Sequence, residues 1–289
     1  MESQKPPTLM AILAHPDDEV FIGGTFACYD QQGARTILVT ATSGDVGEIR
    51  DKSLATPDNL ATVRANELQR SVQALGIDKL YVLGYRDSGM ARTADNNHAA
   101  SFHSAPLENA VERVVRIIRE EKPEVIITAN EYGDYGHPDH VKANRVAQAA
   151  FKAAGDANQF PRAGAPWRPR KLYYGAIPRS EMARWAEMAK ENGEESWGDG
   201  EPPTDIDGNP VPLFTPDEII TTEIDTASCA AKKYAALHAH PTQFAADSFL
   251  FKAPADTLAR LWPREYFRLI EGPLGAGPGE RETDLFAGL

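Results

Sequence analysis

The chain has 289 residues, enough for one sizeable α/β domain or a domain with an elaborated second half. Its formal net charge of −12 argues against a nucleic-acid-binding surface, which needs clustered Lys and Arg to contact phosphates. No apolar run approaches the roughly 20 residues of a membrane-spanning helix. The first apolar run ends at Ala14, directly before acidic residues, so no signal peptide is expected. We therefore expect a soluble, cytoplasmic protein without nucleic-acid or membrane partners.

Cys28 and Cys229 are the only cysteines, and they lie in separate, helix-like contexts. Nothing in their spacing indicates that they pair, so a structural disulfide is not expected. Unpaired thiols fit a reducing compartment such as the cytosol, where disulfides are rare.

Short β-branched runs alternate with amphipathic helical patterns over the first 180 residues. The predicted strands are residues 8–14, 36–41, 80–83, 124–128 and 171–175. The helical stripes between them are Leu68, Val72 and Leu75; Val111, Val114, Val115 and Ile118; and Ala143, Val146, Ala147 and Ala150. Continuous apolar strands that alternate with helices predict a Rossmann-like, doubly wound α/β fold with a mostly parallel sheet.

The composition changes after about residue 190. Residues 191–218 are rich in Glu, Asp, Gly and Pro and show no periodicity, which is typical of a functional lid or a disordered segment. A helix is expected around Ala227–Leu237, and residues 272–279 are interpreted as a linker. We expect a catalytic domain over residues 1–180 and a C-terminal extension with a lid over 181–289. Both parts should form one structural unit around the same crevice.

Two clusters of His and acidic residues follow two of the predicted strands. Residues 15–19, His-Pro-Asp-Asp-Glu, come after the first strand, and residues 137–140, His-Pro-Asp-His, come after the fourth. In a Rossmann-like sheet the first and fourth strands are neighbours, and ligands bind beyond their carboxyl ends. This topology would bring His15, Asp18 and His140 together.

Imidazole nitrogen and carboxylate oxygen are ligands that suit zinc or iron(II). Two histidines and one carboxylate leave coordination positions open for water and substrate, as in a catalytic metal site. We therefore predict that His15, Asp18 and His140 bind a metal, with Zn²⁺ as first choice and Fe²⁺ as the alternative. The competing interpretation is that the two histidines only cap helices and that Asp18 is a first-turn carboxylate stabilised by the helix dipole. The presence of two such clusters at neighbouring strand ends favours metal binding over helix capping.

Taken together, the two clusters resemble the LmbE-like (PIG-L) family of zinc-dependent N-deacetylases. Further matching residues are Gly44 to Glu48, Arg64, Glu67 and Arg86 to Met90. Within the family the chain looks most similar to the mycothiol branch, which contains a glucosaminyl-inositol deacetylase and a mycothiol S-conjugate amidase. Residues 171–174, 240–243 and 282–288 support that placement, the last two pointing towards the amidase. The resemblance covers most of the chain but is weak over residues 191–218.

The resemblance implies roles for residues beside the predicted metal. Asp17 would be the general base that takes the proton of water, and His137 would face the oxyanion or the departing amine. Tyr135 would hydrogen-bond the oxyanion. We expect Asp139 to keep His137 protonated and oriented. The plainer alternatives are a helix N-cap role for Asp17 and surface cover for Tyr135.

Four further residues are candidates for substrate binding. Glu48, Arg64 and Asp87 lie on or near loops that open on the same edge of the predicted sheet, and Gln243 would line the far wall. Carboxylates and guanidinium groups recognise polyols, so an amino-sugar conjugate fits them. The alternative for Arg64 is a helix pair with Glu67. His238 and His240 are left out of the metal set.

The leading functional hypothesis is a metal-dependent hydrolase that removes an acyl group, preferably acetyl, from an N-acetylglucosamine-type conjugate. The alternative is an amidase that cleaves the cysteinyl–glucosamine amide of mycothiol S-conjugates. A nucleotide-binding Rossmann protein is disfavoured, because no Gly-x-Gly-x-x-Gly follows the first strand and acidic residues there would repel pyrophosphate. A sugar-binding module with a dead centre is disfavoured by the complete set of acidic and His residues. Assembly into a homo-oligomer is left open.

Overall fold

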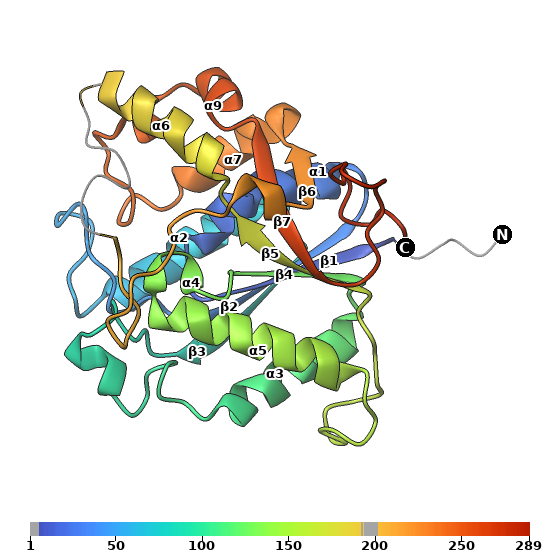
Figure 1. Ribbon diagram of the computed structural model, residues 1–289. Helices are drawn as coiled ribbons and strands as arrows, with labels where there is room; N and C mark the ends of the chain where they lie inside the picture. Colours follow the sequence, from blue (N-terminus) through green and yellow to red (C-terminus); the bar gives the residue numbers. More distant parts are fainter. Residues whose placement is uncertain (1–5, 192, 194–201) are drawn as a thin grey trace.

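The computed structural model describes residues 6–191, 193 and 202–289, and places them around a seven-stranded sheet of order β3-β2-β1-β4-β5-β7-β6 (Figure 1). The strands are β1 (Thr8–Leu13), β2 (Arg35–Thr42), β3 (Lys79–Tyr85), β4 (Val125–Thr128), β5 (Lys171–Ala176), β6 (Thr222–Asp225) and β7 (Arg264–Glu271). Strands β1 to β5 are parallel, whereas β7 pairs antiparallel with β5 and β6. The predicted α/β fold with a mostly parallel sheet is confirmed.

Helices cover both faces of the sheet. They are α1 (Gly23–Gln31), α2 (Leu60–Leu75), α3 (Leu107–Glu121), α4 (Gly133–Gly136), α5 (Pro138–Ala154), α6 (Arg179–Glu191), α7 (Ala230–Leu237), α8 (Phe249–Lys252) and α9 (Ala255–Leu261). The 3₁₀ turns are η1 (Asp18–Ile22), η2 (Ala94–Asn97), η3 (Asp217–Ile219) and η4 (Ala227–Cys229). Apolar side chains of α1, α2 and α7 pack on one face, and those of α3 and α5 pack on the other.

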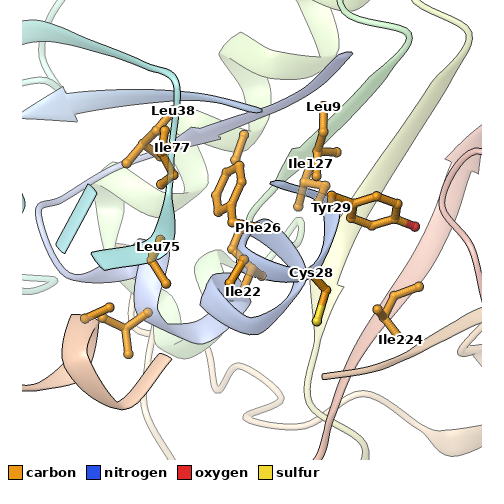
Figure 2. Packing of buried hydrophobic residues seen from close by; sticks show 14 of the residues in the cluster. Leu9, Ile22, Phe26, Cys28, Tyr29, Leu38, Leu75, Ile77, Ile127 and Ile224 are labelled. Atoms are coloured by element: carbon orange, nitrogen blue, oxygen red, sulfur yellow. The ribbon is translucent and has the colours of Figure 1, made fainter. Parts of the chain in front are cut away.

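Strand β1 shows why the sequence pattern predicts this arrangement. Successive side chains of a strand point to opposite faces, so Leu9 joins the core under α1 while Met10 joins the core under α3 and α5. Figure 2 shows Leu9 and Phe26 in the first of these cores. Because β1 is buried on both faces, its sequence is a continuous apolar run rather than an alternating one.

The C-terminal part extends the sheet beyond β5. Strand β7 was not predicted, because Arg264 to Arg268 mixes charged and aromatic residues instead of forming an apolar run. An antiparallel strand can bury some of its side chains in the core and leave the others in contact with solvent, so it tolerates such a mixture. Of the predicted lid, residues 192 and 194–201 lie outside the described residues. Every helix in the described part of the chain is too short or too polar to cross a bilayer.

Cys28 and Cys229 form a disulfide, so the prediction of two separate thiols is wrong. Cys28 lies on α1 and Cys229 ends η4, and packing of these elements places the two Cα atoms 5.7 Å apart. This separation is within the range of disulfides. The two cysteines are 201 positions apart in the chain, so only tertiary packing reveals their proximity. The inference of a reducing compartment from the cysteines thereby loses its basis.

Removal of the disulfide is expected to destabilise the fold. A Cys28→Ser/Cys229→Ser variant should lose about 2–4 kcal/mol of unfolding free energy, because the bond restricts the unfolded chain. Chemical denaturation of both proteins measures this difference. Thiol titration of the unfolded wild type without reductant should detect no free thiol, and two reactive thiols per chain would contradict the bond.

Candidate functional site

The two His clusters meet at the carboxyl ends of the neighbouring strands β1 and β4, as the topology argument predicted. His15 follows β1, and His140 lies in the first turn of α5. His15 Nδ1 and His140 Nε2 lie 3.1 Å apart, and Asp18 Oδ1 lies 3.4 Å from His140 Nε2. The three residues predicted as metal ligands thus converge, and their role as ligands stays a prediction.

More carboxylates surround His15 than the sequence analysis placed there. Asp139 Oδ2 and Asp87 Oδ1 lie 3.3 Å and 3.6 Å from His15 Nε2, and all three side chains are buried. Burial by itself would lower the pKa of His15, but Asp87, Asp139 and Asp18 raise it well above its ordinary value.

Donor atoms gather closely enough at this point for an ion. Ring nitrogens of His15, His137 and His140 lie within 4.8 Å of one another, and a second such group joins His15 and His137 to Asp87 and Asp139. Burial opposes ionisation of Asp18, yet the adjacent His140 and His15 hold the pKa of its carboxyl well below the usual range. Such a concentration of buried carboxylates and imidazoles could bind a metal ion.

Asp17 has a strained backbone, with φ at 112°, directly before η1. Burial raises the pKa of its carboxyl to about 6, although Arg64 acts in the opposite direction. Arg64 Nη2 lies 3.1 Å from Asp17 Oδ2. A left-handed backbone at a non-glycine residue costs free energy and needs surrounding contacts to hold it.

Arg64 is buried on α2 and makes contacts that the sequence analysis did not foresee. Its guanidinium donates to the carbonyl oxygens of Pro16 at 2.5 Å and of Gly44 at 2.9 Å. A Cβ at Gly44 or Gly47 would lie only 2.3 or 2.4 Å from Arg64 Nη1, so these glycines make room for the guanidinium. Arg64 therefore holds the segment around Asp17, and its role in substrate binding stays a prediction.

His137 is the N-cap of α5, and its Nδ1 accepts the backbone N–H of Asp139 at 3.2 Å. A neutral imidazole that accepts at Nδ1 carries its hydrogen on Nε2. Burial, together with His15 and His140, lowers the pKa of His137 well below its ordinary value. The structure therefore holds His137 neutral, not protonated as expected, with its Nε2–H available as a donor.

The expectation that the Asp139 carboxylate orients His137 is wrong. That carboxylate accepts hydrogen bonds from the Ser88 amide, at 2.8 Å, and from the Ser88 hydroxyl, and its other neighbour is His15. A carboxylate oxygen of Asp139 lies within 4.8 Å of a His137 ring nitrogen, but the hydrogen bonds of the carboxylate go to Ser88 and His15. The hydrogen bond from Asp139 to His137 comes from the backbone N–H.

Tyr135 lies in α4, the short turn that precedes α5, with its ring centroid 5.1 Å from that of His140 and 6.0 Å from that of His137. Burial raises the pKa of its phenol, so the hydroxyl keeps its proton and can donate a hydrogen bond. The preceding Asp134 was missed by the sequence analysis. Its Oδ2 lies 3.0 Å from His140 Nδ1, a contact that orients the imidazole.

A second buried network behind Asp17 was also missed. Glu19 Oε2 accepts the backbone N–H of Asp17 at 2.9 Å, while Glu19 Oε1 lies 2.6 Å from His240 Nε2 and accepts the Ser71 hydroxyl at 2.5 Å. Glu67 binds the same C-terminal segment by accepting from the amide and hydroxyl of Thr242. The signal for this network was present, since Glu19 belongs to the first motif and His240 to the matching 240–243 block.

The site opens into a cavity of about 640 Å³. Its lining includes the four predicted substrate-binding residues, namely Glu48, Arg64, Asp87 and Gln243. Gln243 Nε2 donates to the backbone oxygen of Glu48 at 3.2 Å, and the Glu48 side chain is 77% exposed. Asp87 instead lies deep in the site beside His15.

A sequence profile described as PIG-L: GlcNAc-PI de-N-acetylase matches residues 10–151. A protein of Geodermatophilus obscurus named 1D-myo-inositol 2-acetamido-2-deoxy-alpha-D-glucopyranoside deacetylase is 37% identical, over 97% of this chain and 97% of its own length. The chain belongs to the PIG-L family. The resemblance inferred from the two motifs is confirmed, and with it the prediction of a deacetylase-type enzyme.

Two solved structures share the fold of this chain. N,N'-diacetylchitobiose deacetylase from Pyrococcus horikoshii matches with a TM-score of 0.61 and 20% identity, over 93% of this chain and 85% of that chain. GalB, a 4-carboxy-2-hydroxymuconate hydratase from Pseudomonas putida KT2440, also has a TM-score of 0.61, with 16% identity over 94% and 99%. Because the two activities differ, the fold alone does not determine the chemistry.

Glu19→Gln is expected to lower turnover by about tenfold or more, the effect of roughly 1.4 kcal/mol on the barrier. Glutamine has a single acceptor oxygen, so it cannot accept from Asp17 at one end and from Ser71 and His240 at the other. Glu67→Gln is the matched control, because Glu67 is equally buried and binds the same segment without contacting Asp17. Steady-state kinetics and melting temperatures of both variants test this, and equal losses of turnover would count against it.

Proposed function

We propose that this protein is a metal-dependent N-deacetylase that hydrolyses the acetamide of an N-acetylglucosaminyl-inositol conjugate. The observation that carries the proposal is the convergence of His15, His140 and Asp18 beside a half-buried Asp17, in the lining of one cavity. It is supported by relatives that are named for this deacetylation and are 37% and 39% identical over 97% and 98% of the chain. The products would be acetate and the free amine.

The donor set fits a divalent cation. Asp18, Asp87 and Asp139 are carboxylates gathered around His15 in a buried place, where negative charge needs a positive counterpart. We assign His15, Asp18 and His140 as the ligands, with Zn²⁺ as first choice and Fe²⁺ as the alternative. When bound, such an ion supplies Lewis acidity towards water and the amide carbonyl.

Asp17 is the proposed general base. Its carboxylate takes a proton from the attacking water as the water oxygen forms a bond to the amide carbon. A pKa of about 6 leaves Asp17 ionised at neutral pH but more basic than an ordinary carboxylate. Arg64 holds the carboxylate in place.

Tyr135 and His137 are the proposed donors to the oxyanion that forms on the former carbonyl oxygen. The phenol and the neutral imidazole can each donate, because burial keeps the Tyr135 proton on and the hydrogen of His137 lies on Nε2. Asp17 then returns its proton to the glucosamine nitrogen as the carbon–nitrogen bond breaks. Asp87, Arg64, Glu48 and Gln243 are the proposed contacts to sugar hydroxyl groups.

The amidase activity on mycothiol S-conjugates remains the alternative, because it breaks an amide on the same nitrogen and the cavity exceeds the size of an acetyl group. An assay of released amine distinguishes the two. We expect release from N-acetylglucosaminyl-inositol, loss of it after chelation, and recovery on adding Zn²⁺ or, without oxygen, Fe²⁺. Release only from a bimane-labelled mycothiol conjugate would favour the amidase, and release from neither substrate would overturn the proposed function.

Substitution of Asp17 and of Asp18, one at a time, should distinguish the proposed general base from the proposed metal ligand. Asp17→Asn is expected to lower turnover by about 10²–10⁴-fold while the protein keeps its metal, because only the base is removed. Asp18→Asn should lose both metal and activity. Metal content by elemental analysis and turnover on the same preparations provide the measurement. Loss of metal from Asp17→Asn would place Asp17 among the ligands instead.

A further inference from the structure

Three aromatic side chains form one side of the cavity, and removal of an acetyl group does not explain them. Phe21 belongs to η1, Trp185 to α6, and Trp262 follows α9. The ring centroids of Phe21 and Trp262 lie 5.6 Å apart, and those of Trp185 and Trp262 lie 5.1 Å apart in an edge-to-face arrangement. We call this group the aromatic wall.

Contacts with neighbouring residues fix the positions of the two tryptophans of the aromatic wall. The Lys233 ammonium lies 3.2 Å from the ring centroid of Trp262, and it pairs with Glu265 at 2.6 Å. The indole N–H of Trp185 donates to the backbone oxygen of Leu261 at 3.2 Å. Trp262 is buried, whereas Phe21 and Trp185 are half-buried. A ligand that packs on Phe21 and Trp185 would therefore meet a surface whose shape is already set.

Polar groups lie beside the aromatic wall in the same cavity lining. The Tyr266 hydroxyl donates to Glu181 Oε1 at 3.2 Å, and Arg264 pairs through Nε with Glu223 at 2.9 Å. A few polar groups around an apolar surface are typical of a site that orients a small ligand. A ring that bears several hydroxyls has matching chemistry, because its C–H face is apolar and its edge is polar.

We propose that the aromatic wall is a subsite for the second ring of the substrate, the cyclitol or sugar attached to the N-acetylglucosamine unit. This inference rests on the proposed function and assigns its substrate selectivity to the aromatic wall, of which Trp185 and Trp262 belong to the C-terminal part. The ring packs its C–H face on Trp185 and Phe21 and directs hydroxyls towards Glu181 and Arg264. A cavity of about 640 Å³ has the size of sites that enclose whole drug-sized ligands, so it has room for both rings.

Kinetics on two substrates with the same acetamide test the subsite. One is N-acetylglucosaminyl-inositol, and the other is the methyl glycoside of N-acetylglucosamine, which has no second ring. Trp185→Ala should raise KM for the first substrate about tenfold or more with kcat little changed, and should leave KM for the second unchanged. Trp185→Phe, which keeps an aromatic face, should restore most of the affinity.

Trp167→Ala is the matched control. Trp167 is also half-buried, and its indole N–H also donates to a backbone oxygen, that of Pro123, but it does not line the cavity. This variant should change KM for neither substrate. Equal KM changes for both substrates in Trp185→Ala, no change for either, or the same selective change in Trp167→Ala would overturn the subsite.

Calorimetric binding separates failure of the subsite from failure of the proposed function. The probes are glucosaminyl-inositol and methyl glucosaminide, which carry no acetamide and so do not depend on turnover. Wild type should bind glucosaminyl-inositol more tightly, and Trp185→Ala should lose that preference. Where this holds but no amine is released from any acetylated substrate, the subsite stands and the deacetylase proposal falls. Absence of the preference in wild type overturns the subsite whatever the activity.

Discussion

Compensation of negative charge that is withdrawn wholly or partly from solvent is the constraint on which this structure depends. Each of three consecutive acidic residues is paired with a basic residue from a different part of the chain: Asp17 with Arg64, Asp18 with His140, and Glu19 with His240. Glu19 is fully buried and Asp17 and Asp18 are half-buried, so leaving any of these carboxylates unpaired would be costly. The pairs therefore tie α2, α5 and the segment after α7 to the end of β1, and they fix the geometry of the site together with the fold.

Both halves of the chain contribute residues to the site. The parallel strands carry the motifs with His15 and His140, where neighbouring carboxyl ends meet. The C-terminal part adds β7 and β6 to the same sheet and supplies His240, Gln243 and two members of the aromatic wall, Trp185 and Trp262. The fold is shared with a hydratase as well as a deacetylase, so the chemistry depends on these side chains and not on the scaffold.

Several features escaped prediction for one common reason. The disulfide, the contact of Asp134 with His140 and the pair of Glu19 with His240 all depend on where side chains point after packing. The predicted role of the Asp139 carboxylate was wrong for the same reason. Its place two positions after His137 in the sequence gave no information about the direction in which its side chain points. Strand β7 was missed because its charged and aromatic residues form neither the continuous apolar run of a buried strand nor the repeat of an amphipathic helix.

The amino-acid sequence by itself determined the five parallel strands, the helices that cover them, the PIG-L family and the convergence of His15, Asp18 and His140. The strands, the helices and the convergence follow from apolar periodicity and from topology, which act along the chain or between whole strands, and the family follows from the resemblance of the motifs. Tertiary structure alone decided the neutral state of His137, the pairing of Cys28 with Cys229 and the wall of the cavity. These depend on burial and on distances between side chains, which arise only when distant segments pack together.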